Sequence, residues 1–108
     1  MSACMIYVTT SSRDEAVGIA RQLVESRLAA CANVLSAVTS IYWWQGALQE
    51  DSEAVLIIKT RRDLLDAVTA KVKELHSYDC PCVVSLHLGG GNEDYLEWIT
   101  KETMQPIG

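Results

Sequence analysis

The spacing of apolar residues changes several times along the chain, and each change marks a predicted element. Residues 3–10, ACMIYVTT, are apolar at both alternating sets of positions, which predicts a central β-strand. Residues 13–27 carry apolar residues at helical spacing. Ser12, just before them, and Glu15 have the spacing of a capping box. The first strand is therefore followed by a helix.

Two longer segments, residues 32–44 and 48–60, are rich in β-branched and aromatic residues. A turn-forming stretch, Gln-Gly-Ala, separates them, so the pair predicts a long β-hairpin. Thr60 and Asp63 form a Thr-x-x-acid pattern, and apolar residues at helical spacing follow it. This predicts a second helix that starts at Thr60. Its apolar face is expected to consist of Leu65, Val68, Val72 and Leu75.

The remaining chain predicts a strand at residues 82–88, a break at three glycines and a helix capped by Asn92. We expect this helix to turn Tyr95, Leu96 and Ile99 inward. The order β-α-β-β-α-β, followed by a helix, predicts a ferredoxin-like α+β fold with helices on one face of an antiparallel sheet. Residues 1–108 are enough for a single domain.

The predicted hairpin is too long for such a domain. A straight strand over residues 32–44 spans roughly 43 Å, whereas the radius of gyration of a domain of this length is about 13 Å. Its far half is apolar on both faces: Ile41 and Trp43 point one way. Tyr42 and Trp44 point the other. We expect another subunit to cover them; the alternative is a bulge that folds the hairpin back over its own sheet.

Composition and charge limit the classes of binding partner. The net charge of −5 and the pI of about 4.9 disfavour nucleic acids and anionic membranes, which bind basic surfaces. The N-terminal residues lack a basic start, and no stretch approaches the roughly 18 apolar residues of a membrane span. We therefore expect a cytoplasmic protein.

Residues 76–82, HSYDCPC, hold the densest polar chemistry. Imidazole and thiolate groups suit copper or zinc, which makes His76 and Cys82 candidate metal ligands. Their spacing is not that of a zinc finger, and a closed site needs ligands from elsewhere. The alternative, which we favour, is a turn in which Cys82 packs as a small apolar residue. Cys31 is expected in the core.

Patterns typical of catalysis are missing from the sequence. No Ser-His-Asp order or nucleophile elbow is present. The three glycines precede Glu93 and Asp94, which would repel a phosphate from the helix N-terminus. We therefore expect no enzymatic activity.

Three segments together resemble the CutA family of divalent-cation tolerance proteins: SIYWWQGALQEDSEAVLIIKT, KELHSYDCP and GNEDYLEWI. The resemblance extends over essentially the whole chain. It implies a ferredoxin-like fold and a homotrimer in which the long hairpins join neighbouring sheets. It also implies a role in tolerance to copper or another divalent cation, through metal or small-ligand binding in clefts between subunits. The alternative role is a rigid scaffold that stabilises or anchors a partner protein.

On this resemblance, the residues expected at subunit clefts and contacts are Tyr42, Trp43, Trp44, Glu53, Lys59, Tyr78 and Trp98. Glu53 and Lys59 share a strand face but lie about 20 Å apart along it, too far to pair. A neighbouring subunit's aromatic residues beside Lys59 would form a cleft for a small anion.

The chain departs from the family at several positions. Ser77 stands where the family commonly has proline, and Cys82 stands where it commonly has an acid. Thr9 stands where some members have cysteine. Of a His, Glu and Cys ligand set, only His76 therefore matches.

Overall fold

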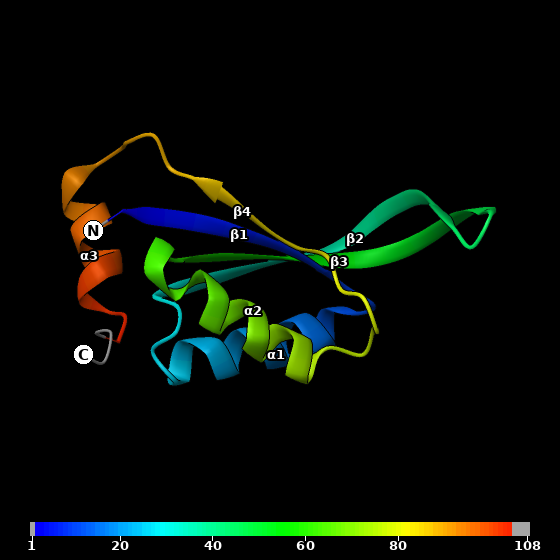
Figure 1. Ribbon diagram of the computed structural model, residues 1–108, viewed down its shortest axis with the longest axis horizontal. Coiled ribbons are helices and arrows are strands. Elements are labelled where there is room, and N and C mark those ends of the chain that lie inside the picture. Colours follow the sequence, from blue (N-terminus) through cyan, green and yellow to red (C-terminus); the bar gives the residue numbers. More distant parts are fainter. Residues whose placement is uncertain (1, 105–108) are drawn as a thin grey trace.

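The computed structural model describes residues 2–104, and its elements follow the predicted order. They are β1 (Ala3–Thr10), α1 (Arg13–Glu25), β2 (Cys31–Trp44), β3 (Ala47–Arg61), the 3-10 turn η1 (Arg62–Leu64), α2 (Leu65–Leu75), β4 (Val83–His87) and α3 (Glu93–Lys101). The strands form one antiparallel sheet in the order β2-β3-β1-β4 (Figure 1). The ferredoxin-like α+β architecture is therefore confirmed.

One face of the sheet packs on α1 and α2 and forms the core (Figure 1). Alternate positions of the two central strands supply it, because successive side chains in a strand point to opposite faces. Fully buried members include Ile6, Val8, Leu56, Ile58, Leu23, Val68 and Val72. The opposite face carries neither of these helices. It leaves large apolar side chains exposed at Tyr7, Leu35, Val84 and Leu86.

The N-terminus of α1 is capped as predicted, with one change. The Ser12 hydroxyl accepts the Glu15 N–H at 3.1 Å. The Glu15 carboxylate, however, accepts the N–H of Ser11 at 3.0 Å rather than that of Ser12. Two hydrogen bonds thus hold the helix N-terminus, but the acid accepts the N–H of the residue before the N-cap and not that of the N-cap itself, as a capping box would have it.

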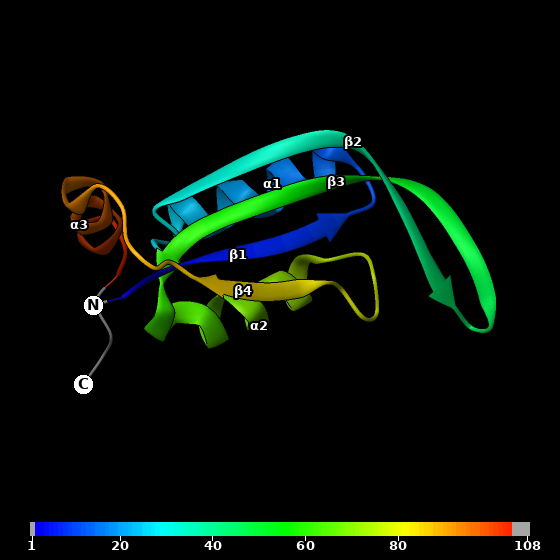
Figure 2. The same ribbon diagram turned by 90° about the horizontal axis from the view of Figure 1, so that it is seen from above.

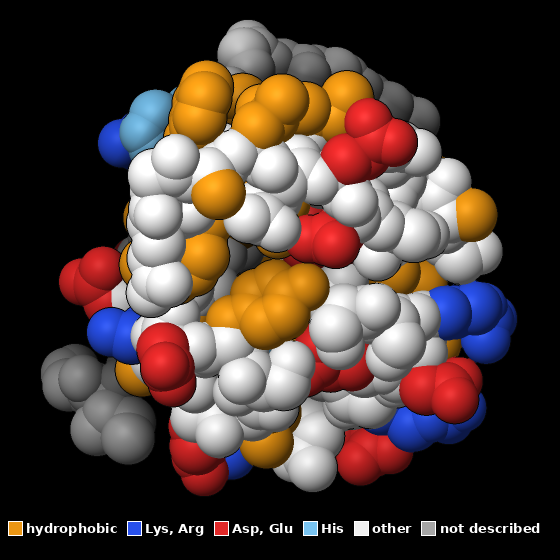
Figure 3. Space-filling model, turned by 90° about the vertical axis from the view of Figure 1, so that its right-hand side faces the viewer, with side chains coloured by type: hydrophobic (Ala, Val, Ile, Leu, Met, Phe, Trp, Pro, Cys, Tyr) orange, Lys and Arg blue, Asp and Glu red, His pale blue; other side chains and the backbone are white. Residues whose placement is uncertain are grey.

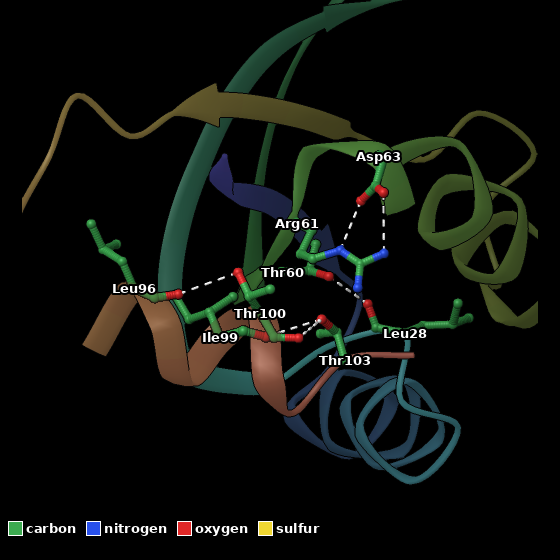
Figure 4. A network of polar contacts seen from close by, with 8 residues as sticks. All are labelled: Leu28, Thr60, Arg61, Asp63, Leu96, Ile99, Thr100 and Thr103. Atoms are coloured by element: carbon green, nitrogen blue, oxygen red, sulfur yellow. Dashed lines mark hydrogen bonds and ion pairs between the residues drawn. The ribbon is translucent and has the colours of Figure 1, made fainter. Parts of the chain in front are cut away.

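The prediction that Thr60 starts the second helix is wrong. Strand β3 continues through Arg61, which pairs with Ala3 of β1. The Thr60 hydroxyl donates to the Leu28 carbonyl at 2.7 Å, and η1 then leads into α2 (Figure 4). A Thr-x-x-acid pattern can belong to a strand end, because long-range pairing overrides a local capping signal.

Arg61 is fully buried beside this strand end. Its Nε and Nη2 donate to the Asp63 carboxylate at 2.9 and 3.1 Å (Figure 4). No residue within 2–104 accepts a hydrogen bond from Nη1. The fork-shaped pair fixes the direction in which the chain leaves β3 for α2.

Strands β2 and β3 continue past the sheet as a projecting hairpin (Figures 1 and 2). The turn residues Gln45 and Gly46 have φ of 49° and 78°, as a type I′ turn requires. The bulge that the sequence raised as an alternative is present between Leu35 and Val38. The hairpin nevertheless bends outward rather than back over its own sheet, and the molecule measures 44 Å along its longest axis.

Two side chains lie where the sequence did not place them. Tyr95 is 40% exposed on α3, whereas Ile99 is fully buried as predicted. Cys31 is only partly buried, because it begins β2 on the sheet face that α1 and α2 leave open. The helices described between residues 2 and 104 are too short or too polar to cross a membrane.

Candidate functional site

A cavity of about 600 Å³ opens where the hairpin leaves the sheet. We call it the hairpin-base cavity. Its aromatic wall consists of Tyr42 and Trp44 from β2 and Tyr78 from the turn between α2 and β4. Figure 3 looks onto this end of the molecule, where hydrophobic and acidic side chains lie next to one another.

The polar wall of the cavity contains two acids, Glu53 and Asp79, and two thiols, Cys80 and Cys82. No lysine or arginine in the described part of the chain lines it. Cys80 is exposed and Cys82 is partly buried. The cavity therefore combines negative charge, thiol groups and aromatic surface.

Glu53 and Tyr78 join the two walls. Glu53 is only 9% exposed, and its Oε2 accepts the Tyr78 hydroxyl proton at 2.8 Å. Burial of the phenol and this bond to Glu53 raise the pKa of Tyr78 far above its usual value. Tyr78 therefore remains a hydrogen-bond donor at neutral pH. Farther out on the hairpin, the Tyr42 hydroxyl donates to Asp51.

His76 does not line the cavity but contacts Tyr78, which does. Its Nδ1 accepts the Tyr78 N–H at 3.0 Å, so the proton resides on Nε2, which lies 2.7 Å from the Thr9 carbonyl oxygen. The His76 and Tyr78 rings are 4.7 Å apart. Both ring nitrogens are engaged, so His76 must give up one of these bonds before it can bind a metal.

The candidate metal donors of the described chain are imidazole, thiol and carboxylate groups. Across residues 2–104, no group of three or more His, Cys, Asp and Glu side chains is arranged to hold a metal ion. A closed site of about four protein ligands is therefore not preformed among these residues of one chain. Cys80 and Cys82 remain as a pair of soft ligands at one edge of the cavity.

Three of the residues expected at clefts lie outside the cavity. Lys59 is at the other end of β3, where its Nζ lies 3.4 Å from the Tyr95 hydroxyl. Trp98 stacks on Tyr95 with ring centroids 5.5 Å apart. Trp43 is 72% exposed on the projecting hairpin. Of the expected set, Tyr42, Trp44, Glu53, Tyr78 and Cys82 line the cavity together.

Glu15 is a supporting residue that the sequence reasoning missed. Its Oε2 accepts the Ser77 N–H at 2.8 Å and so ties α1 to the turn that carries Tyr78. Burial raises the pKa of Glu15, but hydrogen bonds from Ser77 and Ser11 outweigh it and lower the pKa below its usual value. The available signal was Ser77 itself, because a proline at this position has no N–H to donate.

Residues 4–102 match the family model of the CutA1 divalent ion tolerance protein. The chain belongs to the CutA1 family. It is 44% identical over 101 residues to Protein CutA 1, chloroplastic, of Oryza sativa, covering 94% of this chain and 57% of that protein. It is 41% identical to the divalent-cation tolerance protein CutA of Thermus thermophilus, covering 92% of this chain and 96% of that protein. The chain thus spans little more than half of the plant relative but nearly all of the bacterial one.

Solved CutA1 structures share the fold. The crystal structure of CutA1 from Oryza sativa has a TM-score of 0.95 at 42% identity, covering 98% of this chain and 97% of that one. The Thermus thermophilus protein has a TM-score of 0.92 at 40% identity, covering 94% and 99%. The projecting hairpin therefore lies within a fold that CutA1 proteins share.

Proposed function

We propose that this chain is a non-enzymatic, cytoplasmic homotrimer that takes part in divalent-cation tolerance by binding a cation in the hairpin-base cavity. The observation that carries the proposal is the cavity lining, which holds the thiols of Cys80 and Cys82 beside two acids and no basic side chain from residues 2–104. Negative charge in a cleft raises the local concentration of cations. Four free cysteines support a reducing compartment.

Copper is the metal that best suits the thiol edge of the cavity. Thiolates are soft ligands that suit Cu(I) as well as zinc. Cys82 and Cys80 are two residues apart and both line the cavity, whereas both His76 nitrogens are bonded elsewhere. We assign the first metal contacts to the thiols, and His76 to a ligand role only after it releases the Thr9 carbonyl.

The homotrimer is supported by apolar surface that a monomer would leave in water. The open sheet face exposes Val84 at 54% and Leu86 at 57%, and the hairpin exposes Trp43 at 72%. Surfaces of this kind mark protein contacts. Subunit contacts at both places would bring the hairpin of one copy beside the sheet of another.

A titration with copper tests the proposed cation site. Cu(I) and Cu(II) are added separately to the wild type, Cys82→Ser, Cys80→Ser and His76→Ala. Cys31→Ser is the matched control, because Cys31 is a partly buried thiol outside the cavity lining. We expect Cys80→Ser and Cys82→Ser each to lower the Cu(I) affinity about tenfold or more, and Cys31→Ser to leave it unchanged. Equal affinity in all variants would overturn the assignment.

The exposed hairpin favours a second candidate, a rigid trimeric scaffold that stabilises or anchors a partner protein without metal. Ile41 and Leu48 are each 63% exposed next to Trp43. A scaffold keeps its partner in metal-free buffer, whereas a cation-dependent protein binds it only after the cation is added. Pull-downs of the trimer with and without chelator separate the two.

A further inference from the structure

We propose that the hairpin-base cavity also recognises an organic ammonium ion, with Glu53 taking the charged head and Tyr42, Trp44 and Tyr78 surrounding it. The inference goes beyond the proposed function, because it names a second class of ligand for the same cavity. It relies on the carboxylate and the aromatic wall, whereas copper relies on the thiols. The two proposals can therefore fail separately.

Glu53 is suited to hold a cationic head group. Its carboxylate is nearly buried, and Tyr78 occupies only Oε2. No other donor among residues 2–104 bonds this side chain, which leaves Oε1 for a ligand. A charge-assisted hydrogen bond from an ammonium N–H to such a carboxylate is about twice as strong as a neutral one.

The aromatic wall adds a second attraction for the same charge. A cation over the face of an indole or a phenol is drawn by the ring quadrupole, most strongly by tryptophan. Trp44, Tyr42 and Tyr78 line the same cavity as Glu53. Proteins recognise quaternary ammonium groups with cages of aromatic side chains in this way.

Electrostatics disfavours an anion here. Asp79 adds a second carboxylate to the lining, and the nearby acids Glu53 and Glu15 contribute to the raised pKa of Tyr78. Lys59, the lysine expected at an anion cleft, lies 3.4 Å from the Tyr95 hydroxyl and does not line this cavity in its own chain. An anion would therefore meet carboxylates without a compensating cation from residues 2–104.

Size and lining favour an organic ion over a bare hard metal. A space of about 600 Å³ is within the range of small-molecule pockets, roughly 300–1,000 Å³. A hard divalent ion needs about six oxygen ligands, and no three His, Cys, Asp or Glu side chains within residues 2–104 are placed to hold one ion. An ammonium group on an apolar body uses both the carboxylate and the aromatic surface.

Three probes of one shape and different charge test this inference. They are 2-phenylethylammonium, 2-phenylethanol and phenylacetate, each titrated into the full wild-type chain by calorimetry. We expect the ammonium to bind about tenfold or more tightly than the alcohol. Phenylacetate should bind more weakly than either. Equal affinities, tighter binding of phenylacetate, or no binding of the ammonium would overturn the proposal.

Variants locate the binding site. Glu53→Gln should bring the ammonium and the alcohol to the same affinity, because it removes the charge that distinguishes them. Trp44→Leu changes an exposed side chain, so it tests the aromatic wall without altering the buried carboxylate. It should weaken binding of the ammonium more than binding of the alcohol. Glu97→Gln on α3, at the other end of the molecule, is the matched control and should change nothing (Figure 1). A preference for the ammonium that survives both cavity changes would overturn the assignment.

The same variants separate this inference from copper binding. Cys80→Ser and Cys82→Ser should weaken Cu(I) binding but keep the preference for the ammonium over the alcohol. Glu53→Gln should abolish that preference but keep most of the Cu(I) affinity. Loss of both ligands in every variant would contradict two distinct sets of contacts in one cavity.

Discussion

The hydroxyl of Tyr78 lies 2.8 Å from the buried carboxylate of Glu53, although the two residues are 25 positions apart. Glu53 belongs to β3, and Tyr78 belongs to the turn that leads into β4. Because β1 lies between β3 and β4 in the sheet, this bond reaches across the end of β1. It holds the α2–β4 turn against the base of the hairpin and so gives the cavity its shape.

Tyr78→Phe should lower the free energy of unfolding by about 1–2 kcal/mol, because it leaves the Glu53 carboxylate without its donor. Tyr42→Phe is the control and should have a smaller effect, since its bond to Asp51 is exposed. Urea unfolding at fixed protomer concentration measures both. An equal loss in the two variants would contradict a special role for Tyr78.

The effect of Tyr78 should depend on pH in one direction. Its pKa is higher in the folded chain than the usual 10.0, so the folded state holds this proton more tightly. The resulting stability is complete below pH 10 and is lost as the pH rises toward the folded pKa. The stability difference between wild type and Tyr78→Phe should therefore shrink above pH 10, as urea unfolding at several pH values will measure.

Ser77→Pro should raise the pKa of Glu15, because proline lacks the N–H that Glu15 accepts at 2.8 Å. The residue before it is already in the conformation that proline requires, since His76 has φ −82° and ψ 144°. Carboxyl chemical shifts measured against pH report the shift. Ser77→Ala keeps the backbone N–H and should raise the pKa less.

The sign of the acid dependence follows from the lowered pKa of Glu15. A carboxyl whose folded pKa is depressed contributes stability that is present above its usual 4.5 and is lost as the pH falls through the folded pKa. Ser77→Pro reduces that contribution, so the variant should unfold at a higher pH than Ser77→Ala on acidification. Coincident acid transitions would show that Ser77 does not hold Glu15.

Asp63→Asn should destabilise the chain by about 2–3 kcal/mol, because it removes the countercharge of the buried Arg61. The matched control is Asp66→Asn in the first turn of α2, which should have a smaller effect. In an Arg61→Met background, Asp63→Asn should lose most of its effect. Additive losses in this double-mutant cycle would contradict the coupling.

Leu86→Glu should dissociate the proposed trimer, because it places a charge on the open sheet face where Leu86 is 57% exposed. Sedimentation velocity should give a species three times the 11.9 kDa chain for the wild type and a smaller one for the variant. Gln22→Glu adds the same charge on the exposed side of α1 and should leave the assembly intact. A wild-type monomer, or a variant trimer, would contradict this interface.

Local patterns in the sequence were enough to predict the order of elements. Ser12 and Asn92 accept the predicted capping hydrogen bonds, from Glu15 N–H and Asp94 N–H. Gln45 and Gly46 form the turn of the long hairpin. These features depend on residues within a few positions of one another, so periodicity and turn chemistry specify them. The length of the hairpin predicted that it either projects or folds back at a bulge, and the structure shows that it projects.

The sequence by itself therefore determined the elements, their order and the family, whereas the tertiary structure decided which polar side chains meet. Thr60 carries a helix-capping pattern, yet pairing between β1 and β3 and its bond to Leu28 keep it in a strand. His76 has the chemistry of a metal ligand, but Thr9 and Tyr78 engage both of its nitrogens. Such bonds depend on strand register and on the bulge in the hairpin, which arise only when distant segments pack together.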